Sequence, residues 1–308
     1  MCRLYDRPGD AGNRSDWDYE LLRPHDWLPE GGLSFKGDGP PFFGMELEYT
    51  DYGDGQEVAV KHLGMDGQLG WLKEDGSVEG FEAVTHPMAY DWAINHWCWP
   101  MLPALKEAGS RADADHNGLH IHVGLEGFRN TGHQLSWVKF FYRNARRIIP
   151  LAGRESDEWC SFDPERRPGQ ANVLKKKKLV ARQRARHRVL IDAGVPELKI
   201  GNDPEYQRLN AAIAEVTDWE AEARYSAINL TTPYNTFEVR AFASTLEIQR
   251  AQAALGLVAS SVEYTRHLTV GQVRKGGWGW ESYEAWLKGQ DELYGPLLAE
   301  IARTERTA

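Results

Sequence analysis

Apolar and polar residues alternate with a period of two in several stretches of this chain. Turn residues such as Asp66-Gly67 and Asp75-Gly76 separate the early stretches, and such turns favour hairpins. We therefore predict a mostly antiparallel sheet of about six strands. The candidate strands cover residues 42–49, 56–63, 68–74, 79–85, 118–124, 224–230 and 236–242.

Other stretches carry apolar residues at helical spacing. The resulting order is a group of strands, a helix, one strand, a long helical insertion, two strands and a final run of helices. Because strands and helices do not alternate regularly, this order predicts an α+β fold and not a barrel of eight βα units. The candidate helices cover residues 88–108 (broken near Pro100 and Pro103), 133–149, 172–192, 203–216 and 246–267, with one or two terminal helices after them.

Three regions follow from this order. Residues 1–41 are rich in Pro, Gly, Asp and Arg and predict an irregular N-terminal arm, held down by Trp17, Tyr19 and Trp27. Residues 42–270 form the main domain, which contains a basic helical insertion at 153–216. Residues 271–308 are expected to form helices that pack on this domain.

The composition of the chain excludes several classes of protein. Hydrophobic residues make up 42% of the 308 positions, which excludes a disordered or fibrous chain. No apolar run is long enough for a membrane span or a secretory signal. The three cysteines lie far apart and form no CxxC pair, so we expect no disulfide framework or cysteine zinc site, and a reducing, cytoplasmic compartment. The net charge of -9 argues against a broad nucleic-acid surface.

Several predicted strands share an unusual polar face. Residues i and i+2 of a strand project to the same side, so each of these strands has one apolar side and one side with ionisable groups. Ordinary solvated strand faces carry mostly Thr, Ser and Lys instead. The ionisable groups are Glu46 with Glu48, His120 with His122, Glu238 with Arg240, and a single Glu82.

If the apolar sides pack on helices, these groups meet on the opposite face of the sheet. Crowded carboxylates repel one another, and a divalent cation such as Mg²⁺ or Mn²⁺ relieves that repulsion. Neutral imidazoles can complete the ligand shell, and the Arg240 guanidinium can pair with phosphate. Each motif alone is commonly structural, but their coincidence predicts a site for a metal-bound nucleoside triphosphate.

Four segments together resemble the amidoligase family of carboxylate–amine ligases, which is related to glutamine synthetase and glutamate–cysteine ligase. The resemblance extends over most of residues 42–260, and leaves out the N-terminal arm, the insertion and the C-terminal helices. The segments are FFGMELEY, GWLKEDGSVEGFEAVTHP, NGLHIHVG and RYSAINLTTPYNTFEVRAFASTL.

The resemblance implies a glutamine-synthetase-like catalytic fold, in which the sheet forms one wall of a funnel. It also implies ATP- and Mg²⁺-dependent (or Mn²⁺-dependent) formation of an amide or peptide bond through an acyl phosphate. The implied metal ligands are Glu46, Glu48, Glu82, His120 and Glu238, and the implied nucleotide contacts are His122, Arg240, Arg224 and Lys73.

Within that set, the resemblance assigns Arg240, Glu238 and Glu48 to catalysis. Asn229 falls in the same late motif as Arg224, where a substrate or nucleotide contact is expected, and Asp75 belongs to a characteristic family hairpin. The substrates would be a small-molecule or peptide carboxylate and an amine. A homo-oligomer and a phage origin are both compatible with the family.

Residues 174–190 contain eight Lys or Arg residues and no acid. A solvated helix face explains such a run as well as a binding function does. The binding alternatives are a clamp for ATP phosphates, for an acidic acceptor or for nucleic acid.

Three other readings stay open. His120, His122 and Glu126 fit the HxHxxxE spacing of a cupin-like metal site, although no second cupin motif follows. An HxH metal hydrolase of barrel type is a further alternative, but the chain lacks the βα alternation of such barrels. A ligase fold without catalysis, serving as a structural or assembly protein, could keep the same motifs.

Overall fold

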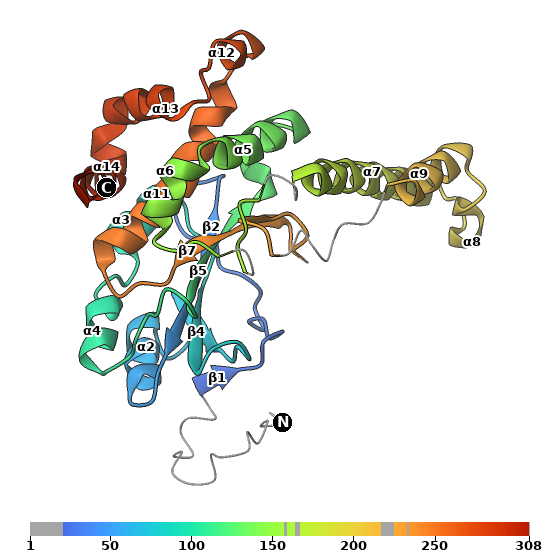
Figure 1. The fold of residues 1–308 in the computed structure, drawn as a ribbon. Helices are drawn as coiled ribbons and strands as arrows, with labels where there is room; N and C mark the ends of the chain where they lie inside the picture. The colour runs from blue at the N-terminus through green and yellow to red at the C-terminus, as the bar shows by residue number, and fades with distance from the viewer. Residues whose placement is uncertain (1–20, 157–158, 164–166, 217–224, 233, 308) are drawn as a thin grey trace.

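The fold is α+β and is built on one open sheet of seven strands (Figure 1). The computed structural model describes residues 21–156, 159–163, 167–216, 225–232 and 234–307. All neighbouring strands pair antiparallel except β1 and β3, which pair parallel. In sheet order the strands are β1 (Leu22–Arg23), β3 (Gly70–Lys73), β4 (Gly80–Thr85), β2 (Phe43–Thr50), β5 (Gly118–Gly124), β7 (Thr236–Ala243) and β6 (Ile228–Asn229).

Helices cover one face of this sheet, and the long buried helix α11 lies at their centre (Figure 1). Helix α11 packs against β5, α3, α5 and α14, while α6 packs against β7. The α-helices are α2 (Gly55–Leu63), α3 (Tyr90–His96), α4 (Met101–Glu107), α5 (Thr131–Arg143), α6 (Ala145–Ala152), α7 (Arg167–Asp192), α8 (Glu197–Ile200), α9 (Pro204–Ala214), α11 (Ile248–His267), α12 (Val270–Arg274), α13 (Trp280–Leu287) and α14 (Asp291–Thr307), with short 3-10 turns η1 (Leu125–Gly127) and η3 (Lys288–Gln290).

The alternating pattern of the central strands builds the core as predicted. Nine apolar residues on the helix-facing side of β2, β5 and β7 are fully buried, which confirms the predicted face of each strand. These residues, each 0% exposed, are Met45, Leu47, Tyr49, Leu119, Ile121, Val123, Phe237, Val239 and Ala241. Because the side-chain period of a strand is two, this packing sends all the intervening residues to the opposite face.

The prediction of a strand at 56–63 is wrong, because this segment is helix α2. Its buried positions are Gly55, Ala59 and Leu63, which recur every four residues as a helix requires. The pair Val58 and Val60 suggested a strand, but both are only partly buried against the core.

One helix prediction and one strand prediction need smaller corrections. The predicted helix 133–149 is two helices that meet at Asn144, whose backbone leaves the helical region and whose Nδ2 donates to the Phe140 carbonyl at 2.8 Å. Within the described residues 225–230 of the predicted strand 224–230, only Ile228 and Asn229 form a strand, β6. The break of the helix predicted at 88–108 is confirmed, since α3 and α4 are separated by Trp97–Pro100.

The described part of the N-terminal arm is more regular than predicted. It adds strand β1 to the edge of the sheet, and Trp27 packs edge-on against Trp71 with ring centroids 5.7 Å apart. Further along, the Lys36 backbone nitrogen donates to the Pro87 carbonyl at 2.9 Å. Trp17 and Tyr19, the other two predicted anchors, lie outside the described residues.

Helices α7, α8 and α9 project together from the body of the protein (Figure 1). They lie in the predicted insertion, and α7 contains the predicted basic helix but begins earlier, at Arg167. Within the ranges described here, no helix is both long enough and apolar enough to cross a lipid bilayer.

His133 joins α5 to α11 in a neutral form. Its Nδ1 accepts from the Arg129 backbone nitrogen at 3.2 Å, so Nε2 carries the proton toward the Val262 carbonyl at 3.0 Å. Burial, helped by the charges of Arg266 and Arg129, lowers the pKa of His133 to about 4. Protonation of Nδ1 would break the bond from Arg129.

We expect His133 to make stability pH-dependent. An unfolded histidine titrates near pH 6.5, so the contribution of His133 is complete above that value and declines as the pH falls toward 4. His133→Gln should lower the melting temperature at pH 7.5 by roughly 2–4 °C. The difference from the wild type should shrink at pH 5 in thermal unfolding by circular dichroism; a constant or growing difference would contradict this assignment.

Candidate functional site

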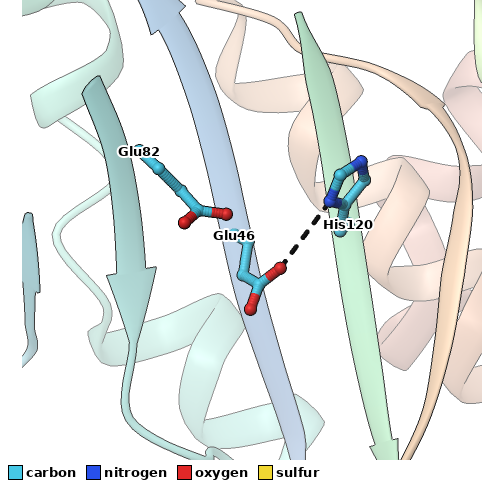
Figure 2. Close-up of side chains that lie close together, drawn as sticks. All are labelled: Glu46, Glu82 and His120. Atoms are coloured by element: carbon cyan, nitrogen blue, oxygen red, sulfur yellow. Dashed lines mark ion pairs between the residues drawn. The ribbon is translucent and has the colours of Figure 1, made fainter. Parts of the chain in front are cut away.

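The polar sides of β4, β2, β5 and β7 bring the predicted ionisable residues together. Strand register places Glu46 opposite His120, Glu48 opposite Glu82, and His122 opposite Glu238. Directly opposed side chains on one face of a sheet lie about 5 Å apart at Cβ. Figure 2 shows the result for three adjacent strands, where Glu46 lies between Glu82 and His120.

His120 lies at the centre of this group and faces three carboxylates. Its Nδ1 is 3.6 Å from Glu46 Oε2 and 3.4 Å from Glu238 Oε1, while its Nε2 is 3.6 Å from Glu48 Oε1. The imidazole is only 4% exposed. These separations exceed good hydrogen-bond lengths, so the groups surround a common space without bonding tightly to one another.

Gly118 allows this close approach at the start of β5. A Cβ at this position would lie 2.6 Å from His120 Nε2 and 2.9 Å from Arg154 Nη2, which real side chains do not tolerate. The Gly118 backbone nitrogen also donates to Glu48 Oε2 at 2.5 Å. The glycine of the NGLHIHVG segment therefore both makes room for the imidazole and orients a carboxylate.

His122 is held between a carboxylate and a hydroxyl. Its Nε2 lies 3.2 Å from Glu46 Oε1, and its Nδ1 lies 3.0 Å from Thr236 Oγ1. Glu46 thus contacts both histidines of the HxH pair. Thr236 was not among the predicted site residues, although it begins the same strand that carries Glu238.

Glu238 is fixed by two partners on the other side of the site. The Arg240 guanidinium forms an ion pair with its Oε1, and Asn229 Nδ2 donates to its Oε2 at 2.7 Å. The Asn229 amide oxygen in turn accepts from the Thr231 backbone nitrogen at 2.8 Å. Asn229, for which a substrate or nucleotide contact is expected, orients the Glu238 carboxylate in this structure. Arg224 lies outside the described residues.

Three overlapping sets of side chains could each hold a metal ion, because the candidate ligand atoms of each set lie within 4.8 Å of one another. Glu46 belongs to two sets and Glu82 to two, so the sets form a connected row across the sheet. The sets are Glu46, Glu82 and His120; Glu46, His122 and Glu238; and Glu48, Asp75 and Glu82. The last set brings in Asp75 from the predicted hairpin between β3 and β4.

The carboxylates of this row differ in how well they are neutralised. Burial alone would raise the pKa of Glu46, but the two neighbouring histidines, His122 above all, hold it well below its usual value. Burial would also raise the pKa of Glu238, yet Arg240 and the histidines bring it down. These two acids are therefore ionised at neutral pH.

Glu82 lacks such compensation. Burial raises its pKa well above the usual value, and the negative charges of Glu46, Asp75 and Glu48 raise it further, against the weaker opposing effect of Lys73. Lys73 lies directly opposite Glu82 on β3. The row thus lacks positive charge around Glu82. Its three ligand sets contain carboxylates and imidazoles but no thiolate, and such ligands fit a hard divalent cation such as Mg²⁺ or Mn²⁺.

A cavity of about 450 Å³ opens beside this row. Glu46, Lys73 and His122 line its polar part, and Tyr234 and Thr236 come from the approach to β7. The described part of the N-terminal arm and its neighbours supply an apolar part of the wall, which includes Leu28, Leu33, Phe35, Phe42 and Trp71. The sequence signalled this wall only as scattered apolar and aromatic residues in an irregular arm.

The predicted convergence of the site residues is therefore observed for all of them except Arg224. Glu126 lines the cavity, but it belongs to none of the three metal-compatible sets found among the described residues. The sheet is also open, with a linear strand order, which contradicts a closed cupin barrel. The order of strands equally contradicts a hydrolase barrel of βα units.

Comparisons with known proteins give no match: no family model fits the chain, and no curated protein is significantly similar to it in sequence.

Glu82 offers a test of the metal site that needs no enzyme assay. Glu82→Gln removes a buried acid that nothing nearby neutralises well, so we expect it to raise the melting temperature in metal-free buffer by roughly 2–4 °C. In the wild type, millimolar Mg²⁺ or Mn²⁺ should raise the melting temperature, because the ion binds only the folded chain. That increase should be smaller in Glu82→Gln, because Glu82 belongs to two of the three ligand sets.

Glu74→Gln is the matched control, since Glu74 lies on the same hairpin but is exposed and belongs to none of the three sets. It should behave as the wild type does in both conditions. A metal response that is undiminished in Glu82→Gln, or that vanishes in Glu74→Gln, would contradict the proposed ligand sets.

Proposed function

We propose that the protein is an ATP- and Mg²⁺-dependent carboxylate–amine ligase with a glutamine-synthetase-like catalytic fold. The observation that carries this proposal is the row of metal-compatible carboxylates around His120, with Arg240 and Lys73 beside it and an adjoining cavity of about 450 Å³. Phosphoryl transfer needs chiefly positioning and charge neutralisation, and this set of groups offers both.

The metal ligands under this proposal are Glu46, Glu48, Glu82, His120 and Glu238, with Asp75 added by the structure. Bound Mg²⁺ or Mn²⁺ would neutralise the phosphate oxygens of ATP and the charge that develops during transfer. His122 and Asn229 have a positioning role, because they orient Glu46 and Glu238 respectively.

Arg240 is the group we assign to phosphate. Burial by itself would lower the pKa of Arg240, but the ion pair with Glu238 and the negative charges of Glu48 and Glu46 together raise it, so the guanidinium stays charged at every working pH. Its planar fork suits phosphate oxygens, and its pairing with Glu238 holds it in place before a ligand arrives. Lys73 supplies a second cation at the edge of the cavity.

The cavity beside the acidic row offers a place for the base of the nucleotide. Phe35, Phe42, Trp71 and Tyr234 provide rings against which an adenine could pack, while the polar part faces the acidic row. The volume falls within the usual range of small-molecule pockets. We therefore assign the base to the aromatic wall and the phosphates to the side of Glu46 and His122.

The proposed reaction has two steps. A substrate carboxylate oxygen attacks the γ-phosphorus of ATP, which releases ADP and leaves an acyl phosphate. The amine nitrogen then attacks the acyl carbon, phosphate leaves, and the proton from nitrogen passes to a carboxylate or to water. The buried surroundings of Glu48 and Glu238, which are each 5% exposed, would keep water from competing with the amine.

The direct experiment measures phosphate release from ATP with Mg²⁺ and mixtures of carboxylates and amines, and identifies the product by mass spectrometry. We expect Glu48→Gln and Arg240→Ala to lower turnover at least about a hundredfold, because each removes charge stabilisation of the transferring group. Both variants should keep the circular dichroism spectrum of the wild type.

Glu126→Gln is the control that separates the alternatives. Glu126 lines the same cavity without belonging to a metal-compatible set, so its variant should retain most of the turnover. Loss of metal binding in this variant would favour the cupin-like HxHxxxE site instead. A well-folded protein that binds no ATP at millimolar concentration would favour the non-catalytic assembly role.

A further inference from the structure

Helix α7 carries a dense positive charge that the candidate site does not use. Eight Lys or Arg residues and no acid occupy positions 174–190. The helix extends away from the sheet, with α9 beside it (Figure 1). On a chain with net charge -9, this concentrated positive charge makes α7 a candidate surface for a partner of opposite charge.

The cations of α7 divide into groups with different surroundings. Arg186 is already neutralised by α9, where its Nη2 and Nε donate to Asp203 at 2.6 and 3.1 Å. Lys175, Lys178 and Arg182 are exposed and line neither the site cavity nor the two cavities beside α7 that are described next.

The remaining cations line two cavities. One, of about 510 Å³, lies between α7 and the loop that joins β6 to β7, and Lys176, Lys177 and Arg184 face Thr231 and Thr232 across it. The other, of about 280 Å³, is lined by Gln183, Arg184, His187, Arg188 and Tyr206. The spacing of Lys177, Arg184 and Arg188 places them on one face of the helix.

The larger basic cavity adjoins the candidate site, because Tyr234 and Asn235 line both it and the site cavity. The two basic cavities adjoin each other at Arg184, which lines both. We refer to the surface lined by Lys176, Lys177, Arg184 and Arg188 as the basic track.

The length of the track indicates the size of its ligand. From Lys176 to Arg188 the helix rises by roughly 18 Å, at 1.5 Å per residue. An extended peptide spans about 3.3 Å per residue, so about five residues cover the track. Alternate or consecutive carboxylates on such a peptide could each meet a cation of α7.

We propose that the basic track binds an acidic peptide segment of about five residues, and that this segment is the substrate whose carboxylate or amine reaches the candidate site. This identification of the substrate class rests on the proposed ligase function. The track supplies fixed positive charge along its length, and the cavity beyond Tyr234 receives the reacting end.

The groups that an amide-forming ligase joins favour a peptide over a nucleic acid as the ligand of the basic track. A peptide carries both of the groups that an amide-forming ligase joins, whereas a phosphodiester chain carries no carboxylate. Single-stranded nucleic acids also bind through rows of stacking aromatic residues. The rings that line the two basic cavities are those of Tyr234, Tyr206 and His187, and they do not form a row along the helix, since His187 and Tyr206 pack on each other while Tyr234 borders the other cavity.

The test is the binding of a fluorescein-labelled hexaglutamate peptide to the full chain, followed by fluorescence anisotropy at low salt without nucleotide or metal. The track variant is Lys176→Gln/Arg184→Gln/Arg188→Gln. The matched control is Lys175→Gln/Lys178→Gln/Arg182→Gln, which removes the same number of charges from the outer side of the same helix. We expect the track variant to weaken binding tenfold or more, and the control less than threefold.

A third variant guards against misfolding. Lys176→Arg/Arg184→Lys/Arg188→Lys keeps every charge of the track, and it should retain binding within about threefold. Equal losses in the track and control variants would overturn the proposal, since long-range charge alone would then explain binding. Absence of binding at millimolar peptide would overturn it as well.

Two further outcomes separate this proposal from its rivals and from the ligase function. Tighter binding of a twelve-nucleotide single strand than of hexaglutamate, lost in the track variant, would overturn the peptide in favour of nucleic acid. Because the binding assay contains neither ATP nor metal, selective loss in the track variant supports the peptide surface even if the turnover assay fails, and the failure is then that of the ligase proposal.

Discussion

Mutual repulsion of buried carboxylates is the constraint on which the rest of this structure depends. Glu48, Glu82 and Glu238 are each at most 5% exposed, and they share one face of a sheet with Glu46. Glu46 and Glu238 are compensated by the two histidines and Arg240, whereas Glu82 is left with Lys73 as its opposing cation. Keeping such charges out of water lowers the stability of the fold, and clusters of this kind are typical of functional sites. The weak neutralisation of Glu82 therefore marks the position in the row where a further positive charge would relieve the most repulsion.

The same alternation of residues produces both the core and the site. The alternating apolar residues of β2, β5 and β7 are buried under the helices, so the residues between them must project from the opposite face of the sheet. A shift of one residue in strand register would exchange the two sets, which would bury the acids in the core. Core packing thus fixes the positions of Glu46, His120 and Glu238, and the polar contacts of Asn229, Thr236 and Gly118 refine their orientation.

Segments remote from the sheet in sequence complete the surroundings of the site. The N-terminal arm pairs with β3 and supplies apolar walls to the cavity, and α7 borders the loop between β6 and β7. Tyr234 and Asn235 are shared by the cavity beside the acids and the cavity beside the cations. The acidic groups of the sheet and the cations of α7 therefore border neighbouring cavities that are separated by these two residues.

The sequence by itself determined the α+β class, most of the elements and nearly all the ionisable residues of the site, because strand periodicity assigns faces without reference to neighbours. It misread 56–63, where the pair of valines resembled a strand while the buried positions Gly55, Ala59 and Leu63 followed a helix. Only the tertiary structure decided which strands are neighbours, and hence that Asp75 joins Glu48 and Glu82, that Thr236 holds His122, and that the arm walls the cavity. Those relations join residues far apart in the chain, and local pattern carries no information about such distances.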